Sequence, residues 1–308
     1  MASAKADRMG SHRLVRLPWL PPFLASDHPL PWLAPLVAML VAFGLYPLLY
    51  SAWLSLHERN RFTRQNVFVG LQQWAEALGD DRMWHALWVT VVYTVLCLVI
   101  QLTLGLAIAL LLDCERRGYG VMRALMTLPL VVPPAIAGMM FLLLEDGEFG
   151  VLTHALVGIG LLGRDQPILG TAGTALAGVM LADIWQWTPF MVLILLAGLR
   201  SLPREPFEAA AIDGASRLQA FRYIALPMLG RVIAVAVLIR GIDLFRIYDY
   251  IYVMTGGGPG TVTETLSWYA GRAFGVADFP YAATLSLITL IVLNILALTF
   301  IRVARVRF

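Results

Sequence analysis

Lysine is almost missing from this chain of 308 residues, since Lys5 is the only one. A phosphate-binding P-loop requires a lysine directly after its glycine-rich turn, where the ammonium group contacts the phosphates of the nucleotide. The chain therefore cannot contain a P-loop, and the glycine cluster at residues 256–260 is not a nucleotide site. We expect no cofactor in this chain, and any ATP hydrolysis must take place on another polypeptide.

Cysteine is also scarce, and the histidines are scattered. Cys97 and Cys114 fall on one apolar run, roughly 25 Å apart if that run is helical, which is too far for a disulfide. We expect both to be packing residues. The five histidines lack metal-ligand spacing, and no Gly-x-Ser-x-Gly motif is present. The sequence thus predicts neither a metal site nor an enzyme.

Charged residues make up only 14% of the chain, whereas 59% of it is hydrophobic. These values lie outside the range of soluble domains, and the apolar runs are long enough to cross a bilayer. We predict an all-α integral membrane protein with one transmembrane domain at residues 32–303, between tails at 1–31 and 304–308. Its six spans are expected near residues 32–54, 87–112, 124–144, 175–199, 228–254 and 281–303.

Two of these segments need comment. The third span is the least regular, because Pro129, Pro133 and Pro134 interrupt it, although kinked spans are tolerated where neighbouring helices satisfy the freed backbone groups. The N-terminal tail has no apolar core before residue 32, so we do not expect a cleaved signal peptide.

The basic residues indicate how the spans are oriented. If both termini are cytoplasmic, 15 of the 23 Lys and Arg residues lie on cytoplasmic segments, six lie on outer segments, and Arg240 and Arg246 lie inside a span. The positive-inside rule favours this topology in the cytoplasmic membrane. The loop at residues 200–227 is then cytoplasmic. The net charge of +3 reflects topology, and we expect no nucleic-acid partner.

The loop at residues 200–227 begins with the chemistry of a short helix. Pro206 suits a first helical turn, Glu208 complements the positive end of the helix dipole, and residues 209–211 are alanines, which are strong helix formers. Gly214 can adopt the left-handed conformation that closes such a helix.

A second short helix follows. Ser216 and Gln219 have the spacing of a capping box, and we expect the helix that they start to end before Pro227. The small alanine side of the first helix permits close approach of a partner, so the pair of helices indicates a docking surface. An ordinary amphipathic connector is the alternative.

This loop resembles the EAA loop of permease subunits of binding-protein-dependent ABC importers. The pattern is Glu-Ala-Ala, three residues, Gly, nine residues and Ile-x-Leu-Pro, and every position matches. In that family the loop is the coupling helix that enters a groove of the ATPase subunit. The resemblance implies the type I ABC importer permease fold. It also implies that the ATPase is contacted through Glu208, Ala209, Ala210, Asp213, Gly214, Phe221, Ile224 and Pro227.

The fifth span carries four charges, Arg240, Asp243, Arg246 and Asp249, each three residues from the next. Each step turns about 300°, so the four cannot line one face of a regular helix. Either they spiral toward several neighbours, or the helix is unwound nearby. A charge at the bilayer centre costs about 2.5–3.5 kcal/mol, so Arg240 and Asp243 should face a partner span or a wet cavity. An internal ladder of ion pairs that holds helices together is the alternative.

The fourth span offers a complementary set near its middle, namely Asp183, Trp185, Gln186 and Trp187, followed by Pro189. Indole rings can stack on the apolar faces of a sugar, while the acid and the amide exchange hydrogen bonds with its hydroxyls. Transport sites near the midplane are commonly built from interrupted helices. The alternative is that the tryptophans only pack between helices.

Two further runs, residues 185–203 and 245–265, resemble carbohydrate-uptake ABC permeases of the maltose-permease F type and the compact trehalose and glycerol-phosphate permeases. The resemblance implies translocation of a disaccharide or short oligosaccharide by a heterodimer with a second, related permease. It also implies two ATPase subunits that bind ATP and magnesium, and an extracytoplasmic sugar-binding protein or lipoprotein. The expected pathway residues are Asp183, Trp185, Gln186, Trp187, Arg240, Asp243, Arg246 and Tyr248.

We expect the loaded binding protein to dock on outer loops at about residues 55–83, 145–170 and 255–280. Three alternatives stay open. A glycerol-phosphate importer would use Arg240 or Arg246 for the anion. An importer of amino acids, polyamines or metals would share the EAA loop but lack the two further runs. An ion-coupled carrier or channel would use the intramembrane charges without ATP.

Overall fold

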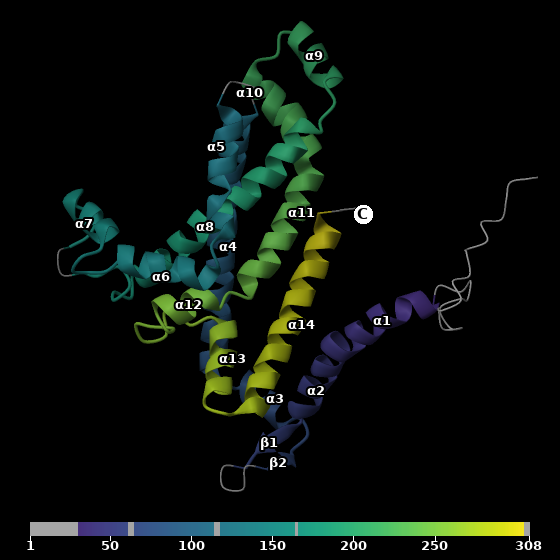
Figure 1. Cartoon of the computed structure of the whole chain (residues 1–308), viewed down its shortest axis with the longest axis vertical. Helices are drawn as coiled ribbons and strands as arrows, with labels where there is room; N and C mark the ends of the chain where they lie inside the picture. The colour runs from purple at the N-terminus through teal and green to yellow at the C-terminus, as the bar shows by residue number, and fades with distance from the viewer. Residues whose placement is uncertain (1–29, 61–64, 114–117, 164–165, 305–308) are drawn as a thin grey trace, which may run out of the picture. The chain divides into compact units, whose positions relative to one another are not determined.

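The computed structural model describes residues 30–60, 65–113, 118–163 and 166–304, most of which are helical (Figure 1). The chain divides into two units, residues 1–53 and 54–308. The described part of the first unit is one apolar helical run. It consists of α1 (Leu30–Leu40), a π-helical turn (Val41–Leu45) and α2 (Tyr46–Leu54), whose last residue begins the second unit.

The second unit holds the remaining helices and one small hairpin. β1 and β2 pair antiparallel, with His57 opposite Phe68. In chain order the elements are β1 (His57–Arg59), β2 (Asn66–Phe68), α3 (Gln72–Leu78), α4 (Asp81–Leu112), α5 (Tyr119–Met126), the 3-10 turn η2 (Leu128–Val131), α6 (Pro134–Leu144), α7 (Val151–Gly158), α8 (Ala175–Arg200), α9 (Glu205–Ile212), α10 (Arg217–Ala220), the π-helical turn η3 (Phe221–Ala225), α11 (Leu226–Phe245), α12 (Asp249–Met254), α13 (Leu266–Gly275) and α14 (Phe279–Val303).

Five helical segments of the described chain are long and apolar enough to cross a membrane. A sixth crossing is formed only if residues 119–131 and 134–144 are joined, and these two pieces are bent by 96° at the break between them. Pro129 lies in η2, and Pro133 and Pro134 open α6, so missing N–H groups end one helix and start another. The predicted interruption of the third span is confirmed. The five segments are residues 33–54, 81–112, 175–200, 217–254 and 279–303.

α4 and α8 pack along each other in the second unit, and α11 packs against both (Figure 1). Gly105 of α4 permits this closeness, because a Cβ there would be 2.7 Å from the Cβ of Met191 in α8. Gly198 of α8 plays the same part where α11 crosses, since a Cβ there would be 2.8 Å from a methyl group of Val232. Small residues at helix crossings are typical of packing in membranes.

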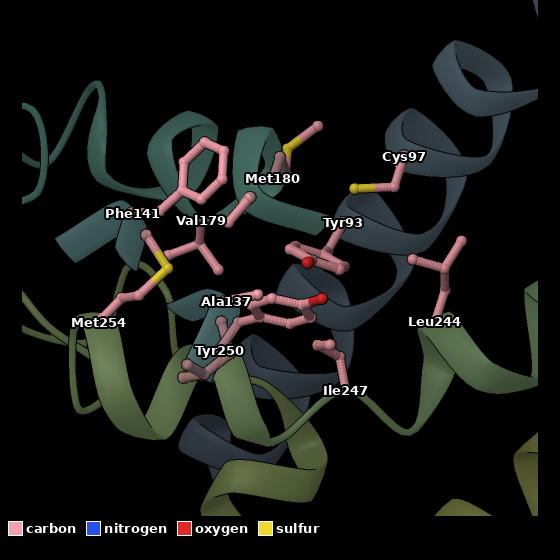
Figure 2. Close-up of a cluster of buried hydrophobic side chains, with 12 residues drawn as sticks. Tyr93, Cys97, Ala137, Phe141, Val179, Met180, Leu244, Ile247, Tyr250 and Met254 are labelled. Atoms are coloured by element: carbon pink, nitrogen blue, oxygen red, sulfur yellow. The ribbon is translucent and has the colours of Figure 1, made fainter. Parts of the chain in front are cut away.

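A buried apolar cluster joins α4, α6, α8 and α12 (Figure 2). The rings of Tyr93 and Tyr250 lie near its centre, and Phe141 and Val179 pack beside them. Cys97 is a buried free thiol in the same cluster, which agrees with the packing role expected for it. Cys114 lies outside the described residues. The cluster fixes the short helices α6 and α12 against the two long central ones.

The fifth span begins earlier than the sequence indicated. α10 continues through η3 into α11, and in η3 the amide of Leu226 donates to the carbonyl of Phe221, five residues earlier. Pro227 follows at the second position of α11. The prediction that the second loop helix ends before Pro227 is therefore wrong. The wide turn shifts the hydrogen-bond ladder by one residue, so a proline without an N–H is accommodated without breaking the helix.

Asp80 ties three elements of the second unit together. Its Oδ1 accepts from the amide of Arg82 at 2.9 Å and caps α4, while its Oδ2 accepts from the hydroxyls of Tyr269 at 2.5 Å and Tyr281 at 2.8 Å. Burial acts to raise the pKa of Asp80. The hydrogen bonds from the two tyrosines and from the backbone outweigh that effect, so the pKa lies below its ordinary value.

Glu145 is a buried acid directly after α6. Its side chain is only 1% exposed, and among the described residues neither carboxylate oxygen has a hydrogen-bond partner. Gly178 of α8 leaves room for it, because a Cβ there would be 2.5 Å from Oε2. Burial raises the pKa of Glu145 from 4.5 to about 7. The protonated form is therefore the one that this position favours.

Replacing Glu145 with Gln should stabilise the protein above neutral pH. Between pH 4.5 and 7 the native state binds more protons than the unfolded state, so stability falls as pH rises through this window and stays low above it. We expect Glu145→Gln to raise the Tm in detergent by about 5 °C at pH 8, with a much smaller rise at pH 5. Glu148→Gln, at an exposed neighbour, is the control. Equal shifts for the two variants at pH 8 would contradict this account.

Candidate functional site

The loop between α8 and α11 folds as helix, glycine bend and helix, as its sequence predicts. Pro206 and Glu208 lie in the first turn of α9. Gly214 follows that helix with φ 79°, a left-handed conformation that favours glycine. Ser216 and Gln219 form the capping box of α10, in which Gln219 Oε1 accepts from the amide of Ser216 at 2.8 Å.

Large apolar side chains are exposed on this otherwise polar loop. Ile212 is 86% exposed, Leu218 is 73% exposed and Tyr223 is 69% exposed. Tyr223 also lines a hollow of about 340 Å³, together with residues that include Gly214 and Ile224. Exposed apolar side chains on a loop with such a hollow are typical of a surface that another protein covers. The loop therefore has the form of a docking element.

The eight residues expected to contact an ATPase occupy this one region of the fold. Asp213, Gly214 and Ile224 line the hollow itself. The others lie on α9, η3 or the first turn of α11: Glu208, Ala209 and Pro227 are exposed, and Ala210 and Phe221 are half-buried.

A buried polar cluster connects the three central helices. Arg240 of α11, 2% exposed, forms a salt bridge through Nη2 with Asp183 of α8, which is fully buried. Gln101 of α4 bridges the two: its Nε2 donates to Asp183 Oδ1 at 2.6 Å, and its Oε1 accepts from Arg240 Nε at 2.9 Å. The guanidinium carbon also lies 4.7 Å from the ring centroid of Trp187. Asp183 and Arg240 thus neutralise each other inside the protein through Oδ1, while Asp183 Oδ2 has no hydrogen-bond partner among the described residues.

A second buried group lies beside the first. Gln186, 1% exposed, donates through Nε2 to the carbonyl of Val132, and its Oε1 accepts from the hydroxyl of Tyr250. Val132 lies at the break between η2 and α6, where prolines leave backbone groups without helical partners. Gln186 therefore holds the bent third span and α12 to α8.

The charge series on the fifth span is divided by a break in the helix. α11 ends at Phe245 and α12 begins at Asp249, so the alternative in which the helix is unwound is confirmed. Arg240 pairs with Asp183 of α8, which agrees with the alternative of a structural ion pair that holds helices together. Asp243 and Arg246 pair with each other at 3.1 Å, with side chains 39% and 61% exposed.

The aromatic residues of the expected pathway separate into different environments. Trp187 is half-buried under Arg240, whereas Trp185 is 38% exposed and packs against Phe141 at 5.5 Å between ring centroids. Tyr248 lies at the break itself and stacks on Tyr252 at 5.6 Å. The eight expected pathway residues therefore do not form one constellation.

Sequence reasoning missed several members of these groups. Gln101 could have been found, because it is an isolated amide in a long apolar span. No comparable signal marked Tyr250, Tyr252 or Trp268, since aromatic residues are common in apolar spans. The bend after α11 brings Tyr250 to Gln186, and it brings Tyr252 and Trp268 to Tyr248.

Residues 101–307 match the family described as binding-protein-dependent transport system inner membrane component. The chain is 34% identical over 275 residues to the trehalose/maltose transport system permease protein MalF of Thermococcus litoralis, covering 89% of this chain and 92% of that protein. It is 35% identical over 237 residues to the trehalose transport system permease protein SugA of Mycobacterium tuberculosis, covering 77% and 75%. These relatives are transport permeases, which agrees with the prediction that the chain is not an enzyme.

Among solved structures, the chain resembles one from a bacterial ABC transporter involved in the import of the acidic polysaccharide alginate. The TM-score is 0.76 at 20% identity, and the match covers 89% of this chain and 93% of that one. A bacterial alginate ABC transporter in complex with an alginate pentasaccharide-bound periplasmic protein gives a TM-score of 0.75 at 21% identity, with 89% of this chain and 92% of that one covered. At this identity the likeness shows the fold, so the predicted all-α permease fold is confirmed.

Breaking the buried pair from one side should destabilise the protein strongly. Arg240→Met leaves Asp183 as an unpaired buried charge and Asp183→Leu leaves Arg240 unpaired, each at a cost of about 3–5 kcal/mol. The double variant removes both charges, so it should recover most of the loss. The measurement is Tm and folded yield in detergent. The exposed pair supplies the control, since Asp243→Leu and Arg246→Met should each cost about 1 kcal/mol or less. Single Arg240 and Asp183 variants as stable as wild type would refute this role.

Proposed function

Because the chain belongs to the family of inner membrane components of binding-protein-dependent transport systems, we propose that it is the transmembrane subunit of an ATP-driven sugar importer. The cargo is a disaccharide or short oligosaccharide. The names of relatives that cover most of the chain support this class, because they describe trehalose and maltose transport. The observation that carries the ATP-driven mechanism is the exposed loop around Gly214, with its exposed apolar side chains and its hollow.

The chain supplies the path, and other subunits supply the energy. With Lys5 as its only lysine it has no P-loop, so ATP and magnesium are bound by two partner ATPase subunits. A second, related permease completes the path, and an extracytoplasmic sugar-binding protein or lipoprotein delivers the cargo. In this arrangement both termini and the loop at residues 200–227 are cytoplasmic, as the positive-inside rule favours.

The coupling step uses the loop between α8 and α11. Closure of the ATPases moves α9, and the Gly214 bend transmits this motion to α10. Since α10, η3 and α11 are one continuous segment, the motion reaches the middle of the protein without an intervening hinge. The spans then change from inward-facing to outward-facing, and the sugar leaves inward after hydrolysis.

The sugar path follows the exposed side of the break after α11. Asp243 and Arg246 are accessible in this chain and can exchange hydrogen bonds with hydroxyl groups. Asp183, Gln186 and Arg240 contribute indirectly, because they are buried and their contacts with one another and with neighbours hold the helices beside the path. Trp187 supports Arg240 in the same way.

The outer loops receive the binding protein. A network centred on Glu264, which is 1% exposed, fixes the glycine-rich loop after α12: Arg82 Nε lies 2.9 Å from its carboxylate and Arg272 Nη1 lies 3.8 Å away. A loop held in this way presents a preformed surface, so little conformational entropy is lost on docking. The loops near residues 55–83 and 145–170 complete that surface.

The proposal is tested by reconstituting the chain with its partner permease and ATPases in vesicles. We expect the vesicles to take up radiolabelled trehalose or maltose. This uptake should require the loaded binding protein, and it should require ATP on the side of the membrane that carries the ATPases. A vanadate-inhibited sample is the control. Uptake that persists without ATP, or uptake of glycerol phosphate and no sugar, would contradict the proposal and favour a carrier or an anion importer.

Substitutions in the loop that leave the spans intact should uncouple ATP hydrolysis from sugar uptake. Glu208→Gln and Gly214→Val are expected to lower ATP-dependent uptake at least about tenfold, since loss of a buried interfacial charge or of a left-handed glycine costs more than about 1.4 kcal/mol. ATPase activity should no longer respond to the loaded binding protein.

Two neighbours in the chain offer matched controls. Glu205→Gln alters an exposed acid in the same helical turn, and Gly230→Ala alters a glycine with ordinary φ and open space around its Cα. Both should retain near-normal uptake. Normal coupled uptake by Glu208→Gln and Gly214→Val would remove the loop from the mechanism.

A further inference from the structure

Three aromatic rings meet where the fifth span breaks. Tyr248 and Tyr252 stack with their centroids 5.6 Å apart and their planes 15° from parallel. Trp268 of α13 lies 5.8 Å from the first ring and 5.7 Å from the second, tilted against both. We call this group the aromatic platform.

Two glycines bring the backbone directly against these rings. A Cβ on Gly271 would be 2.5 Å from the Tyr248 ring, and a Cβ on Gly257 would be 2.2 Å from Nε1 of Trp268. Gly257 also has φ 87°, a conformation that excludes most other residues. The backbone therefore supports the platform from beneath and fixes the position of its rings.

The platform is not an ordinary buried packing cluster. Tyr252 is 58% exposed, because the stacked ring of Tyr248 can cover only one of its two faces. Among the described residues, no hydrogen bond uses the hydroxyl of Tyr248, the hydroxyl of Tyr252 or the indole N–H of Trp268.

Neighbouring tyrosines in the same segments behave differently. Tyr250 donates its hydroxyl to Gln186, and Tyr269 and Tyr281 donate theirs to Asp80. The two tyrosines of the platform therefore differ from these neighbours, because their hydroxyls have no partner in the described part of the chain.

The platform also adjoins exposed charge. Tyr248 is two residues from Arg246, which pairs with Asp243 and is 61% exposed. A sugar ring matches this combination, because it has apolar C–H faces that stack on aromatic rings and hydroxyls at its rim that need donors and acceptors. A small anion would use the guanidinium alone and would gain nothing from stacked rings.

We propose that Tyr248, Tyr252 and Trp268 form a carbohydrate-stacking subsite next to Asp243 and Arg246. This inference rests on the proposed function, and it adds the surface on which the sugar is held during passage. Stacking without a closed pocket gives a weak site, as transport requires, since the cargo must enter and leave in each cycle.

The test uses the whole importer in vesicles, with trehalose and maltose as probes. Tyr252→Ala and Trp268→Leu should lower the maximal uptake rate about tenfold, the loss expected for a ring contact, while the binding-protein concentration that gives half the maximal rate stays unchanged. Tyr252→Phe keeps the ring and should retain most of the rate. Trp88→Leu, an equally large change at an exposed indole of α4, is the matched control.

A second readout is independent of turnover. Saturation-transfer NMR on the detergent-solubilised importer should show transfer to the C–H protons of trehalose or maltose, and Tyr252→Ala and Trp268→Leu should abolish it. Co-purification of the second permease should match wild type in both variants, and Tm should match it in Tyr252→Ala, whereas Trp268→Leu should lower Tm because Trp268 also packs against the buried apolar cluster.

Each contrary outcome has a separate meaning. Sugar uptake by wild type with unchanged rates in Tyr252→Ala and Trp268→Leu overturns the subsite and leaves the proposed function standing. Loss of the second permease from these variants shows a subunit contact, and a raised half-maximal binding-protein concentration shows a docking contact; either overturns the subsite. Absence of sugar uptake by wild type defeats the proposed function itself, and the subsite with it.

Discussion

A charge inside a membrane protein has to be neutralised by the protein, and this constraint organises the centre of the chain. Arg240 cannot be left unpaired at that depth, so α11 must approach Asp183 of α8. Gln101 of α4 forms hydrogen bonds with both partners and fixes the third helix. The register of three long helices is thus set by one buried arrangement. Glycines at the crossings, such as Gly105, allow the backbones to come close enough for these short polar contacts.

The same arrangement determines which polar groups remain available to a ligand. Asp183, Gln186 and Arg240 are committed to internal contacts, whereas Asp243 and Arg246 pair only with each other at an exposed position. The break after Phe245 creates this difference, because α12 turns away from the direction of α11 (Figure 1). Residues on the two sides of the break therefore have different roles despite their regular spacing in the sequence.

Much of the fold could be predicted because its signals are local. Apolar run length located the spans, prolines located the bend in the third, and the capping residues Ser216 and Gln219 located the loop helices. For the candidate site, the sequence predicted which types of residue take part, but not which residues contact one another. The spacing of the charges from Arg240 to Asp249 showed that they could not share one face, but not which of them would find a partner on another helix. That choice depends on helix rotation and on the π-helical turn before Pro227, neither of which has a strong local signature.

The π-helical turn also has a mechanical consequence. Since it carries the helix through Pro227, residues 217–245 form a lever arm about 43 Å long at about 1.5 Å per residue. A tilt of about 10° at the loop end displaces the far end by about 7 Å, roughly the width of a sugar ring. The lever ends where the helix unwinds at Arg246. Because Arg240 joins the lever to Asp183 of α8 and Gln101 of α4, a tilt of this size carries the three helices together, and α12, anchored to α8 through Tyr250, moves with them.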